Sequence, residues 1–334
     1  MTARALVTGG AGFIGSHLVD ALVAHGAAVT VLDDFSSGRR ENLSEAQRRG
    51  SVRIVEGSVL DEAAVAEAIG GCTLVYHLAV QCVRSSLGRP LENHAVNATG
   101  TLRVLEAARR QKVARFVYCS SSEVYGNCGG ERLNEETTQC APVTVYGAAK
   151  LAGEHYALAY FRTYGLSSAV VRPFNAYGPR SHATGESAEV VPRFIVRALN
   201  GLPPVIFGTG ENARDFTYVT ETARAIALAG GCDRLVGRVA NIAYGKKITI
   251  ASAAAAVTRL CGRPELKPTH MRSRPGDVDS LQADTRVAQT MLGFSAEIEF
   301  EEGLKRTIEW FRAHHRDPSL LLEEETQNWH MPVN

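Results

Sequence analysis

A tyrosine and a lysine stand four residues apart, at Tyr146 and Lys150. Side chains at positions i and i+4 of a helix lie on one face, so a phenol and an ammonium group meet there. A free tyrosine has a pKa of about 10 and is a poor base at neutral pH, but a nearby cation favours the phenolate. A phenolate can take a hydroxyl proton while an oxidised nicotinamide takes the hydride from the same carbon. The same spacing is frequent on purely structural helices, so the rest of the chain decides its meaning.

Hydroxyl and carboxylate side chains cluster at residues 120–123, directly after an apolar run at 116–119. In a parallel sheet, ligands bind beyond the carboxyl ends of the strands, so this cluster is expected on the ligand side. For Glu123 the alternative is a solvated carboxylate at a strand end. The expected catalytic residues are Tyr146, Lys150, Ser121, Ser122 and Glu123.

The N-terminal segment offers a site for a dinucleotide. An apolar run at 5–7 precedes Gly9, Gly12 and Gly15, and a helical pattern follows them. The first glycine permits a tight turn, the second leaves room for a pyrophosphate, and the third lets the helix pack on its strand. Unpaired N–H groups at the start of that helix suit phosphate oxygens. The next apolar run ends in Asp33, at the distance where an acid accepts the adenosine ribose hydroxyls.

Asp33 also predicts which dinucleotide binds. A carboxylate at this position accepts both ribose hydroxyls and repels a 2′-phosphate, so NAD is expected rather than NADP. Arg39 and Arg40 are the opposing argument, because they lie only a few residues further on.

Short β-branched runs alternate with helical stretches through the first half of the chain. This rhythm predicts an α/β fold, a doubly wound parallel sheet of the Rossmann type with helices on both faces. The alternation stops after Pro173, which predicts an NAD-binding domain over 1–173 and a smaller, mainly substrate-binding region over 174–334. A strand and a helix are expected to return to the first domain near 215–245. The expected strands are 5–7, 29–32, 52–55, 74–78, 116–119, 169–171 and 239–242.

Long helical patterns span 93–110 and 145–164, and a third helix is expected at 190–199 after an irregular stretch. The second helix is rich in small residues, which favour close packing either within one chain or against a second subunit. The short acidic tail from Asp317 is expected to be loosely ordered.

The composition excludes several classes of protein. A chain of 334 residues with a net charge of +1 provides no field for nucleic acid or an anionic membrane surface. No run approaches the roughly 20 apolar residues of a membrane span, and no secretory signal pattern is present, so the protein is expected in the cytoplasm. The seven cysteines lack the spacing of a zinc site or a disulfide framework, so no metal is expected and the thiols are expected to be reduced, mostly in the core.

Together these motifs resemble the extended short-chain dehydrogenase/reductases, in the group of nucleotide-sugar epimerases and dehydratases. The resemblance covers nearly the whole chain, at 8–15, 33–42, 77–79, 120–126, 172–175, 214–215 and 274–277 and at the Tyr-Lys pair. It implies a UDP-sugar substrate and a homodimer formed by the helices at 97–110 and 145–164. The cofactor contacts that it implies are Gly9, Gly12, Phe13, Ile14, Gly15, Asp33, Asp34, Ser37, Gly38, Ser58, Val59, Leu78, Ala79, Val80, Asn97, Tyr146, Lys150 and Pro173.

The resemblance also implies roles at the substrate. Ser121 would bind the sugar 4-hydroxyl, Tyr146 would act as the base, and Lys150 would contact the cofactor ribose. Arginine forks suit phosphate oxygens, which favours a diphosphate role for the predicted arginines over a surface pair of Arg214 with Asp215. The implied substrate contacts are Ser121 and Ser122 at the sugar, Asn175, Arg214 and Arg274 at the diphosphate, Phe207 at the base, Asp277 at the ribose, and also Val190 and Arg193.

Three positions depart from the pattern of the group. Many relatives carry an aspartate facing the adenine where this chain has Ser58, and sugar epimerases place a glycine and a lysine at the positions of Val80 and Cys82. The departure at Ser58 affects the adenine contact that the resemblance implies.

A transient 4-keto sugar has three fates: hydride return to the other face, loss of water across carbons 5 and 6, or decarboxylation of a uronate. Glu123 favours the second and third, because Ser-Glu-Val-Tyr-Gly resembles a segment of certain dehydratases and uronate decarboxylases. Ser122 argues against dehydration, and the sequence 145–150 is closer to the epimerases.

Across its length the chain most resembles bacterial UDP-glucuronate 4-epimerases, including those of antibiotic biosynthesis. The expected reaction is NAD-dependent conversion of UDP-glucuronate to UDP-galacturonate, and Arg193, or else Arg180 or His182, is expected to hold the carboxylate. The alternatives are a UDP-glucose 4-epimerase, a 4,6-dehydratase, a UDP-glucuronate decarboxylase and a nucleotide-sensing scaffold without activity.

Overall fold

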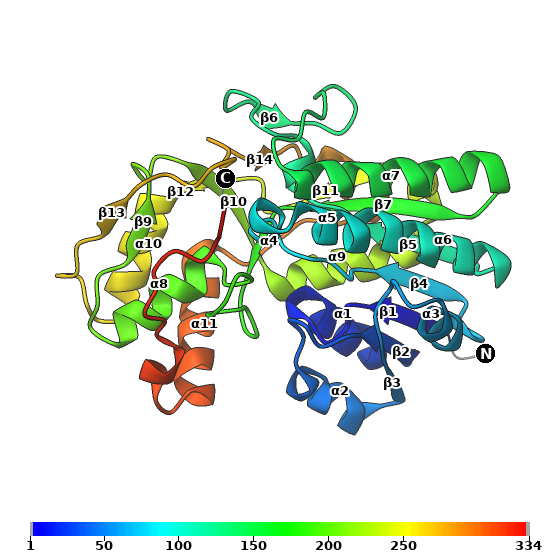
Figure 1. The fold of residues 1–334 in the computed structure, drawn as a ribbon, viewed down its shortest axis with the longest axis horizontal. Helices are drawn as coiled ribbons and strands as arrows, with labels where there is room; N and C mark the ends of the chain where they lie inside the picture. Colours follow the sequence, from blue (N-terminus) through cyan, green and yellow to red (C-terminus); the bar gives the residue numbers. More distant parts are fainter. Residues whose placement is uncertain (1–2, 332–334) are drawn as a thin grey trace.

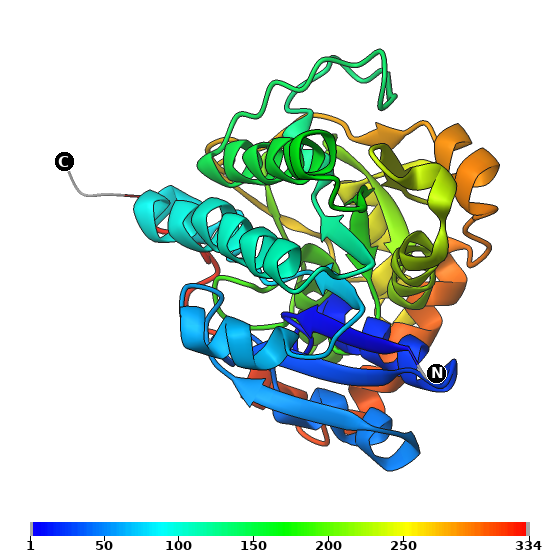
Figure 2. The same ribbon diagram turned by 90° about the vertical axis from the view of Figure 1, so that its right-hand side faces the viewer.

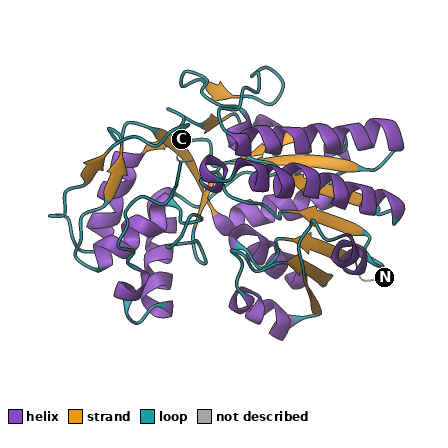
Figure 3. Ribbon diagram, viewed as in Figure 1, coloured by secondary structure: helices purple, strands orange, loops and turns teal. Residues whose placement is uncertain are grey.

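The computed structural model describes residues 3–331 of the chain. Seven parallel strands form its central sheet (Figure 3), namely β1 (Arg4–Thr8), β2 (Ala28–Asp33), β3 (Val52–Glu56), β4 (Leu74–His77), β5 (Arg115–Cys119), β7 (Ser168–Pro173) and β11 (Val239–Ile242). Their order is β3-β2-β1-β4-β5-β7-β11, so the direction in which successive strands are added to the sheet reverses between β1 and β4 (Figure 1). The predicted doubly wound fold and the return of 239–242 to the sheet are confirmed. In such a fold the ligand crevice opens where the order reverses.

Helices cover both faces of the sheet (Figure 2). Successive side chains of a strand point to opposite faces, so in β1 the side chain of Val7 packs on one helical layer and that of Leu6 on the other. One layer contains α1 (Phe13–Ala24), α2 (Ser44–Arg49) and α9 (Val219–Gly231), and the other contains α3 (Glu62–Ile69), α6 (Thr101–Arg110) and α7 (Val145–Tyr164).

Local signals set both ends of α7. The hydroxyl of Thr144 accepts the amide of Gly147 at 3.1 Å, which caps the first turn. Gly165 ends the helix at φ 70°, a conformation that favours glycine. The predicted helix at 145–164 is therefore confirmed to the residue, and Tyr146 lies in its first turn.

The predicted helix at 93–110 is less regular than expected. It consists of α5 (Pro90–His94), a π-helical turn over Ala95–Gly100, and α6, and a short helix α4 (Ser85–Gly88) precedes it. Asn97 lies in the π-helical turn, where its Oδ1 accepts the amide of Gln81 at 2.9 Å and its Nδ2 donates to the carbonyl of Gln81 at 3.0 Å. The turn thereby holds the loop that follows β4, in keeping with the frequent occurrence of π-helical turns near functional sites.

The C-terminal region has an apolar core of its own and lies beside the sheet (Figure 1). Within it the rings of Phe216 and Phe300 stack at 5.0 Å between centroids, and Tyr177 packs against Phe300 at 5.1 Å. The region also confirms the predicted helix at 190–199, whereas the domain boundary at 173 stays a prediction. Its elements are β8 (Asn175–Tyr177), α8 (Val190–Leu199), β9 (Val205–Phe207), β10 (Ala213–Tyr218), β12 (Lys247–Thr249), α10 (Ile250–Leu260), β13 (Thr269–Met271) and α11 (Phe300–His314).

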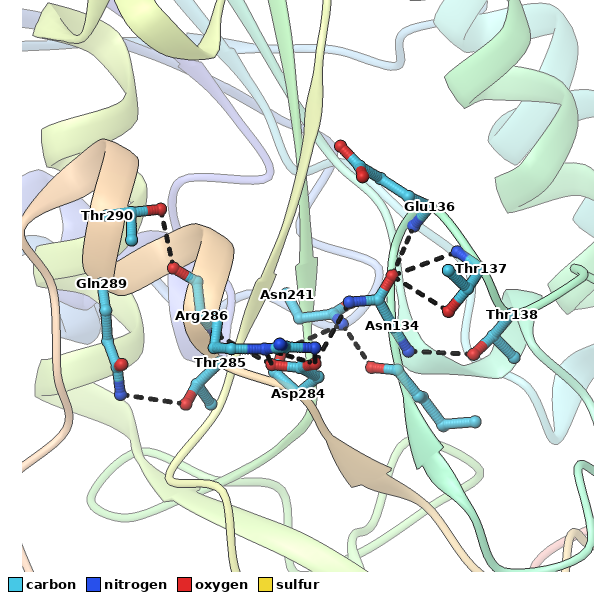
Figure 4. A network of polar contacts seen from close by, with 11 residues as sticks. Asn134, Glu136, Thr137, Thr138, Asn241, Asp284, Thr285, Arg286, Gln289 and Thr290 are labelled. Carbon is cyan, nitrogen blue, oxygen red and sulfur yellow. Dashed lines mark hydrogen bonds and ion pairs between the residues drawn. The ribbon is translucent and has the colours of Figure 1, made fainter.

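A polar network joins the segment after β5 to the returning strand β11 (Figure 4). Asn241 Nδ2 donates to the carbonyl oxygens of Leu133 at 2.8 Å and Asp284 at 3.3 Å. Asn134 donates to the Asp284 carboxylate at 3.1 Å, and the hydroxyl of Tyr125 donates to Asn241 Oδ1 at 2.9 Å. These contacts, with the parallel pair β6 (Arg132–Leu133) and β14 (Gln282–Ala283), fix the segment that begins with the catalytic cluster.

The C-terminal tail is packed, so the prediction of a loosely ordered segment is wrong for the described residues 317–331. Trp329 is buried, and its ring lies edge-on to Phe207 with centroids 4.5 Å apart. The side chain of Asn328 donates to the carbonyl of Gly185 at 3.2 Å. A buried aromatic ring and bonds to the loop before α8 hold the tail, although its composition is polar.

Other composition-based predictions concern thiols, membranes and metals. All seven cysteines carry free thiols, but only Cys72, Cys119 and Cys261 are buried, so fewer lie in the core than expected. In the part of the chain that the structure describes, no helix has the length and apolar character needed to cross a bilayer. Within residues 3–331 no group of three or more His, Cys, Asp or Glu side chains is arranged to hold a metal ion.

Candidate active site

Two joined cavities lie at the carboxyl ends of the strands. The first, the cofactor chamber, has a volume of about 330 Å³ and is lined by the loops after β1, β2, β4 and β5. The second, the substrate chamber, has a volume of about 190 Å³ and lies between α8, β9 and β10. The residues that line both chambers are Val83, Arg84, Glu123, Asn175, Ala176 and Glu189. A substrate whose nucleotide end lies in the substrate chamber can therefore extend its reacting end into the cofactor chamber.

The glycine turn of the cofactor chamber has no room for side chains. Gly9 has φ 68°, and a Cβ there would lie 2.8 Å from the backbone of Ala79. A Cβ on Gly15 would lie 2.1 Å from the carbonyl oxygen of Gly9. Gly12 lines the cavity itself, beside the start of α1. The turn therefore needs glycine where the sequence predicted it, and the backbone of α1 is open to a phosphate.

Asp33 lines the chamber and also forms hydrogen bonds to the loops around it. Its two carboxylate oxygens accept the amides of Ala11 at 2.8 Å and Phe35 at 2.9 Å. Burial raises the pKa of Asp33, and these two hydrogen bonds oppose that rise. Neither Arg39 nor Arg40 lines the chamber, and Arg40 is paired with Glu56, so the argument for a bound 2′-phosphate loses both of its cations.

Tyr146 and Lys150 both line the cofactor chamber. Burial raises the pKa of Tyr146 above its usual value, and a hydrogen bond with Ser121 opposes that rise. Lys150 Nζ donates to the carbonyl oxygen of Cys119 at 2.5 Å and lies 4.8 Å from the centre of the Tyr118 ring. The positive charge of an oxidised nicotinamide bound in the chamber would oppose the effect of burial and favour the phenolate.

A buried ion pair supports the strand end below the catalytic cluster. Arg172 Nε and Nη2 donate to Glu154 at 2.9 and 2.7 Å, and the hydroxyl of Ser120 donates to the same carboxylate. All three side chains are buried. Although burial alone would lower the pKa of Arg172, the bonds to Glu154 raise it. This triad connects α7, β5 and β7, and the sequence reasoning missed it.

Glu123 is not the solvated carboxylate that one interpretation of the sequence allowed. It lines both chambers and forms no ion pair with any residue in the range 3–331. Burial raises the pKa of Glu123, while the charges of Arg214 and Arg274 lower it. Its carboxyl group therefore faces the ligand.

The substrate chamber carries the predicted arginines. Arg214 and Arg274 both pair with Asp277, at 2.7 and 2.6 Å. The alternative of a surface pair between Arg214 and Asp215 is wrong, because Asp215 is buried and accepts backbone amides, among them that of Gly245. The chamber thus gathers cations where a diphosphate is expected to bind.

Two predicted contacts lie outside the cavity walls. Asn97 is buried behind the loop after β4, where its side-chain amide is hydrogen-bonded to the backbone of Gln81. Gly38 lies behind Asp33, where a Cβ would come within 2.8 Å of the carboxylate. The predicted residues that line a chamber are Gly9, Gly12, Phe13, Ile14, Gly15, Asp33, Asp34, Ser37, Ser58, Val59, Leu78, Ala79, Val80, Ser121, Ser122, Glu123, Tyr146, Lys150, Pro173, Asn175, Val190, Arg193, Phe207, Arg214, Arg274 and Asp277.

The three candidates for a substrate carboxylate occupy different places. Arg180 pairs with Asp20 at 2.7 Å and lines neither chamber, so it is not available to a substrate. His182 lines the cofactor chamber and is bound to Glu189 at 3.1 Å. Arg193 lines the substrate chamber, and its Nη2 donates to the tail carbonyl of Thr326 at 2.5 Å.

Several lining residues had no sequence signal. Arg84 lies in the irregular loop after β4, and Glu189 lies just before α8. Asn328 and Trp329 come from the tail, about 120 residues after the strand β9 that they approach. No local pattern predicts such a contact, since it depends on how distant segments pack.

Comparison with known proteins agrees with this geometry. Residues 5–243 match the NAD dependent epimerase/dehydratase family. The chain belongs to this family. It is 36% identical over 319 residues to the dTDP-glucose 4,6-dehydratase of Streptomyces niveus, with 92% of this chain and 93% of that protein covered.

Two solved structures show the same fold. The UDP-glucose 4-epimerase of Thermotoga maritima, in complex with UDP-glucose, has 36% sequence identity and a TM-score of 0.87, with 93% of this chain and 99% of that chain covered. A variant UDP-glucuronic acid 4-epimerase of Bacillus cereus, in complex with UDP-4-deoxy-4-fluoro-glucuronic acid and NAD, has 28% identity and a TM-score of 0.86, with the same coverage. These similarities confirm the α/β fold and the predicted family.

The chain is thus an enzyme of an NAD-dependent family, and NAD is its cofactor. The first chamber fits that group, because its glycine turn leaves the backbone open and Asp33 faces the cavity. Two buried oxygens on the chamber wall, Gln81 Oε1 and Asn175 Oδ1, have no hydrogen-bond partner among the described residues. Buried polar atoms without partners are rare, so both indicate a polar ligand.

Proposed function

We propose that the enzyme catalyses the 4-epimerisation of a UDP-sugar, with UDP-glucuronate as substrate and UDP-galacturonate as product. The observation that carries this proposal is the position of Tyr146 and Ser121 in the cofactor chamber, next to a substrate chamber rich in arginine. A nucleotide-sensing scaffold has no use for such a base, so we favour an enzyme over that alternative.

Bound NAD would supply a hydride acceptor and a positive charge. Tyr146 removes the proton of the sugar 4-hydroxyl, and Ser121, which lines the same chamber, orients that hydroxyl. After the 4-keto sugar turns its other face to the cofactor, Tyr146 returns a proton to the carbonyl oxygen while the hydride returns to carbon 4. Lys150 is positioned to contact the cofactor ribose from the same helix face.

The substrate chamber suits a nucleoside diphosphate. Its walls carry five arginines and three carboxylates, an excess of two positive charges. A diphosphate ester carries about two negative charges at neutral pH, which this excess balances. Phe207 and Trp329 form an aromatic wall at the far end, where a uracil ring can pack.

Glu123 supports the second candidate, a dehydratase or decarboxylase. A carboxyl group whose pKa is raised by burial can donate or accept a proton at carbon 5. The Bacillus cereus 4-epimerase has the same fold and is in complex with a fluorinated UDP-glucuronic acid, which supports a uronate as substrate. In an epimerase, Glu123 would position the sugar through hydrogen bonds.

The proposal includes a cytoplasmic homodimer. Leu102 of α6 and Val145 and Tyr164 of α7 are exposed apolar side chains on two neighbouring helices, 38%, 40% and 58% exposed. Burial of this surface against a second copy would stabilise a four-helix interface. The seven free thiols suit the reducing cytoplasm. Light scattering at micromolar protein concentration tests the dimer, and a monomer would remove it.

Substrate incubation with product analysis by NMR tests the reaction. The purified protein with NAD is incubated separately with UDP-glucuronate and UDP-glucose. UDP-galacturonate supports the proposal, a UDP-pentose identifies a decarboxylase, and a 4-keto-6-deoxy sugar identifies a dehydratase. Turnover of UDP-glucose alone would remove the uronate assignment.

A further inference from the structure

Arg84 lies where the two chambers meet. It follows β4 in the loop before α4, and it is the one arginine within residues 3–331 that lines both cavities. Arg193, Arg214 and Arg274 line the substrate chamber alone. The position of Arg84 is therefore between the diphosphate end of a substrate and the reacting carbon beside Tyr146.

The guanidinium of Arg84 is held by a hydrogen bond at its Nε atom. Its Nε donates to the carbonyl oxygen of Glu186, and Cys82 Sγ donates to the same oxygen at 3.3 Å. The carboxylate of Glu186 is bound by Arg89 at 2.7 Å. Glu186 thus fastens the loop after β4 to the loop before α8, and the two Nη groups of Arg84 remain for another partner.

Arg84 has no ion-pair partner among the described residues, whereas Arg214 and Arg274 do. Arg214 and Arg274 share Asp277, at 2.7 and 2.6 Å. Burial lowers the pKa of Arg84 and the positive charge of Arg274 adds to this effect, while Cys82 and the Glu189 carboxylate, with which Arg84 forms no ion pair, oppose it. A partly buried cation without an anion is unfavourable, so the missing anion is expected to arrive with the ligand.

The groups that interact electrostatically with Arg84 identify the part of the ligand. Arg84 lines the cofactor chamber together with Tyr146 and Glu123, at the reacting end of the site. Its charge also acts on Tyr146, Glu189 and Arg274. The diphosphate has its own cations in Arg214 and Arg274. A neutral hexose would bring no anion to the junction, whereas a hexuronate brings the carboxylate on carbon 6.

We infer that Arg84 binds the carbon-6 carboxylate of the sugar and selects a uronate over a neutral hexose. This inference rests on the proposed function and deepens it. The planar fork of a guanidinium binds a carboxylate through two parallel hydrogen bonds, which gives both affinity and orientation. Arg84 takes the role that the sequence suggested for Arg193, whose side chain is bonded to the tail instead.

The same contact protects the intermediate. When carbon 4 is a ketone, the bond between carbons 5 and 6 can break, its electron pair forming an enolate as carbon dioxide leaves. This loss requires that bond to stand perpendicular to the carbonyl plane. A carboxylate held by Arg84 is stabilised as an anion and is restrained from turning, so the ketone survives until the hydride returns.

The experiment compares Arg84→Gln with Arg53→Gln, which removes a surface cation of β3 that is paired with Glu67 and lines neither chamber. For Arg84→Gln we expect kcat/KM for UDP-glucuronate to fall about 10- to 100-fold, the loss typical of a charged hydrogen bond. Turnover of UDP-glucose should change by less than about threefold, and any UDP-pentose by-product should increase. Arg53→Gln should leave the turnover of both substrates nearly unaffected. Equal losses on the two substrates would overturn the inference and assign Arg84 to the diphosphate.

A binding measurement separates this inference from the proposed reaction. In a Tyr146→Phe background without turnover, calorimetric titration compares UDP-glucuronate with UDP-glucose, with and without Arg84→Gln. Selective weakening of UDP-glucuronate supports the carboxylate contact even if the enzyme proves to be a decarboxylase. Equal affinities of the two nucleotide sugars for the protein that retains Arg84 would overturn the contact, whatever the reaction.

Discussion

The buried triad of Glu154, Arg172 and Ser120 should control the stability of the strand ends that carry the site. Glu154→Gln keeps the shape of the side chain but leaves the Arg172 guanidinium buried without its anion. Removing one partner of a buried pair costs about 3–5 kcal/mol. Both side chains of this pair are at most 5% exposed, so solvent cannot compensate. For a chain of 334 residues this corresponds to a fall in Tm of about 4–7 °C.

The assay is thermal unfolding followed by circular dichroism, with Glu45→Gln as the matched control. Glu45 is also bound by two arginines, Arg48 and Arg49, but at the surface, so its substitution should leave Tm nearly unchanged. The double variant Glu154→Leu/Arg172→Met should recover much of the lost stability, because it removes both charges. If Glu154→Gln proves as mild as the Glu45 variant, the triad does not stabilise the fold and the reasoning is refuted.

Three further predictions concern catalysis and binding. Tyr146→Phe should lower kcat at least ~100-fold and leave the Kd for NAD within about threefold, measured by steady-state kinetics and by titration; an unimpaired variant would exclude the phenol as base. Burial raises the pKa of Tyr146, and a bound cation lowers it. The ultraviolet phenolate signal of Tyr146, isolated by subtracting the titration curve of Tyr146→Phe, should therefore appear at lower pH with NAD than without it. Titration curves that coincide with and without NAD would contradict this. Trp329→Ala should raise KM for the UDP-sugar about tenfold with kcat within about threefold, and an unchanged KM would show that the tail does not contact the nucleotide.

Local patterns were sufficient to predict the sheet and the helix that carries Tyr146 and Lys150. The strands are apolar runs bounded by turns, and a threonine cap and a terminal glycine fix the ends of α7. The glycine turn was equally predictable, because the backbone at Gly9 and Gly15 has no space for a Cβ.

The features that were missed depend on contacts between distant segments. Glu154 and Arg172 lie 18 positions apart on different elements, and nothing in either neighbourhood marks them as a pair. The Arg84 guanidinium is held by Glu186, about 100 residues away, whose carbonyl oxygen accepts a hydrogen bond from Nε of Arg84. The tail was misjudged because its acidic composition gives no sign that Trp329 is buried against Phe207.

The most direct test of the central claim follows a deuterium label. UDP-glucuronate carrying deuterium at carbon 4 is incubated with the enzyme and NAD, and the product is examined by NMR and mass spectrometry. If the hydride leaves carbon 4 and returns to the opposite face, UDP-galacturonate keeps the label at carbon 4 and gains no solvent proton at carbon 5. Exchange at carbon 5, loss of carbon dioxide, or loss of the label to solvent would contradict 4-epimerisation by this site.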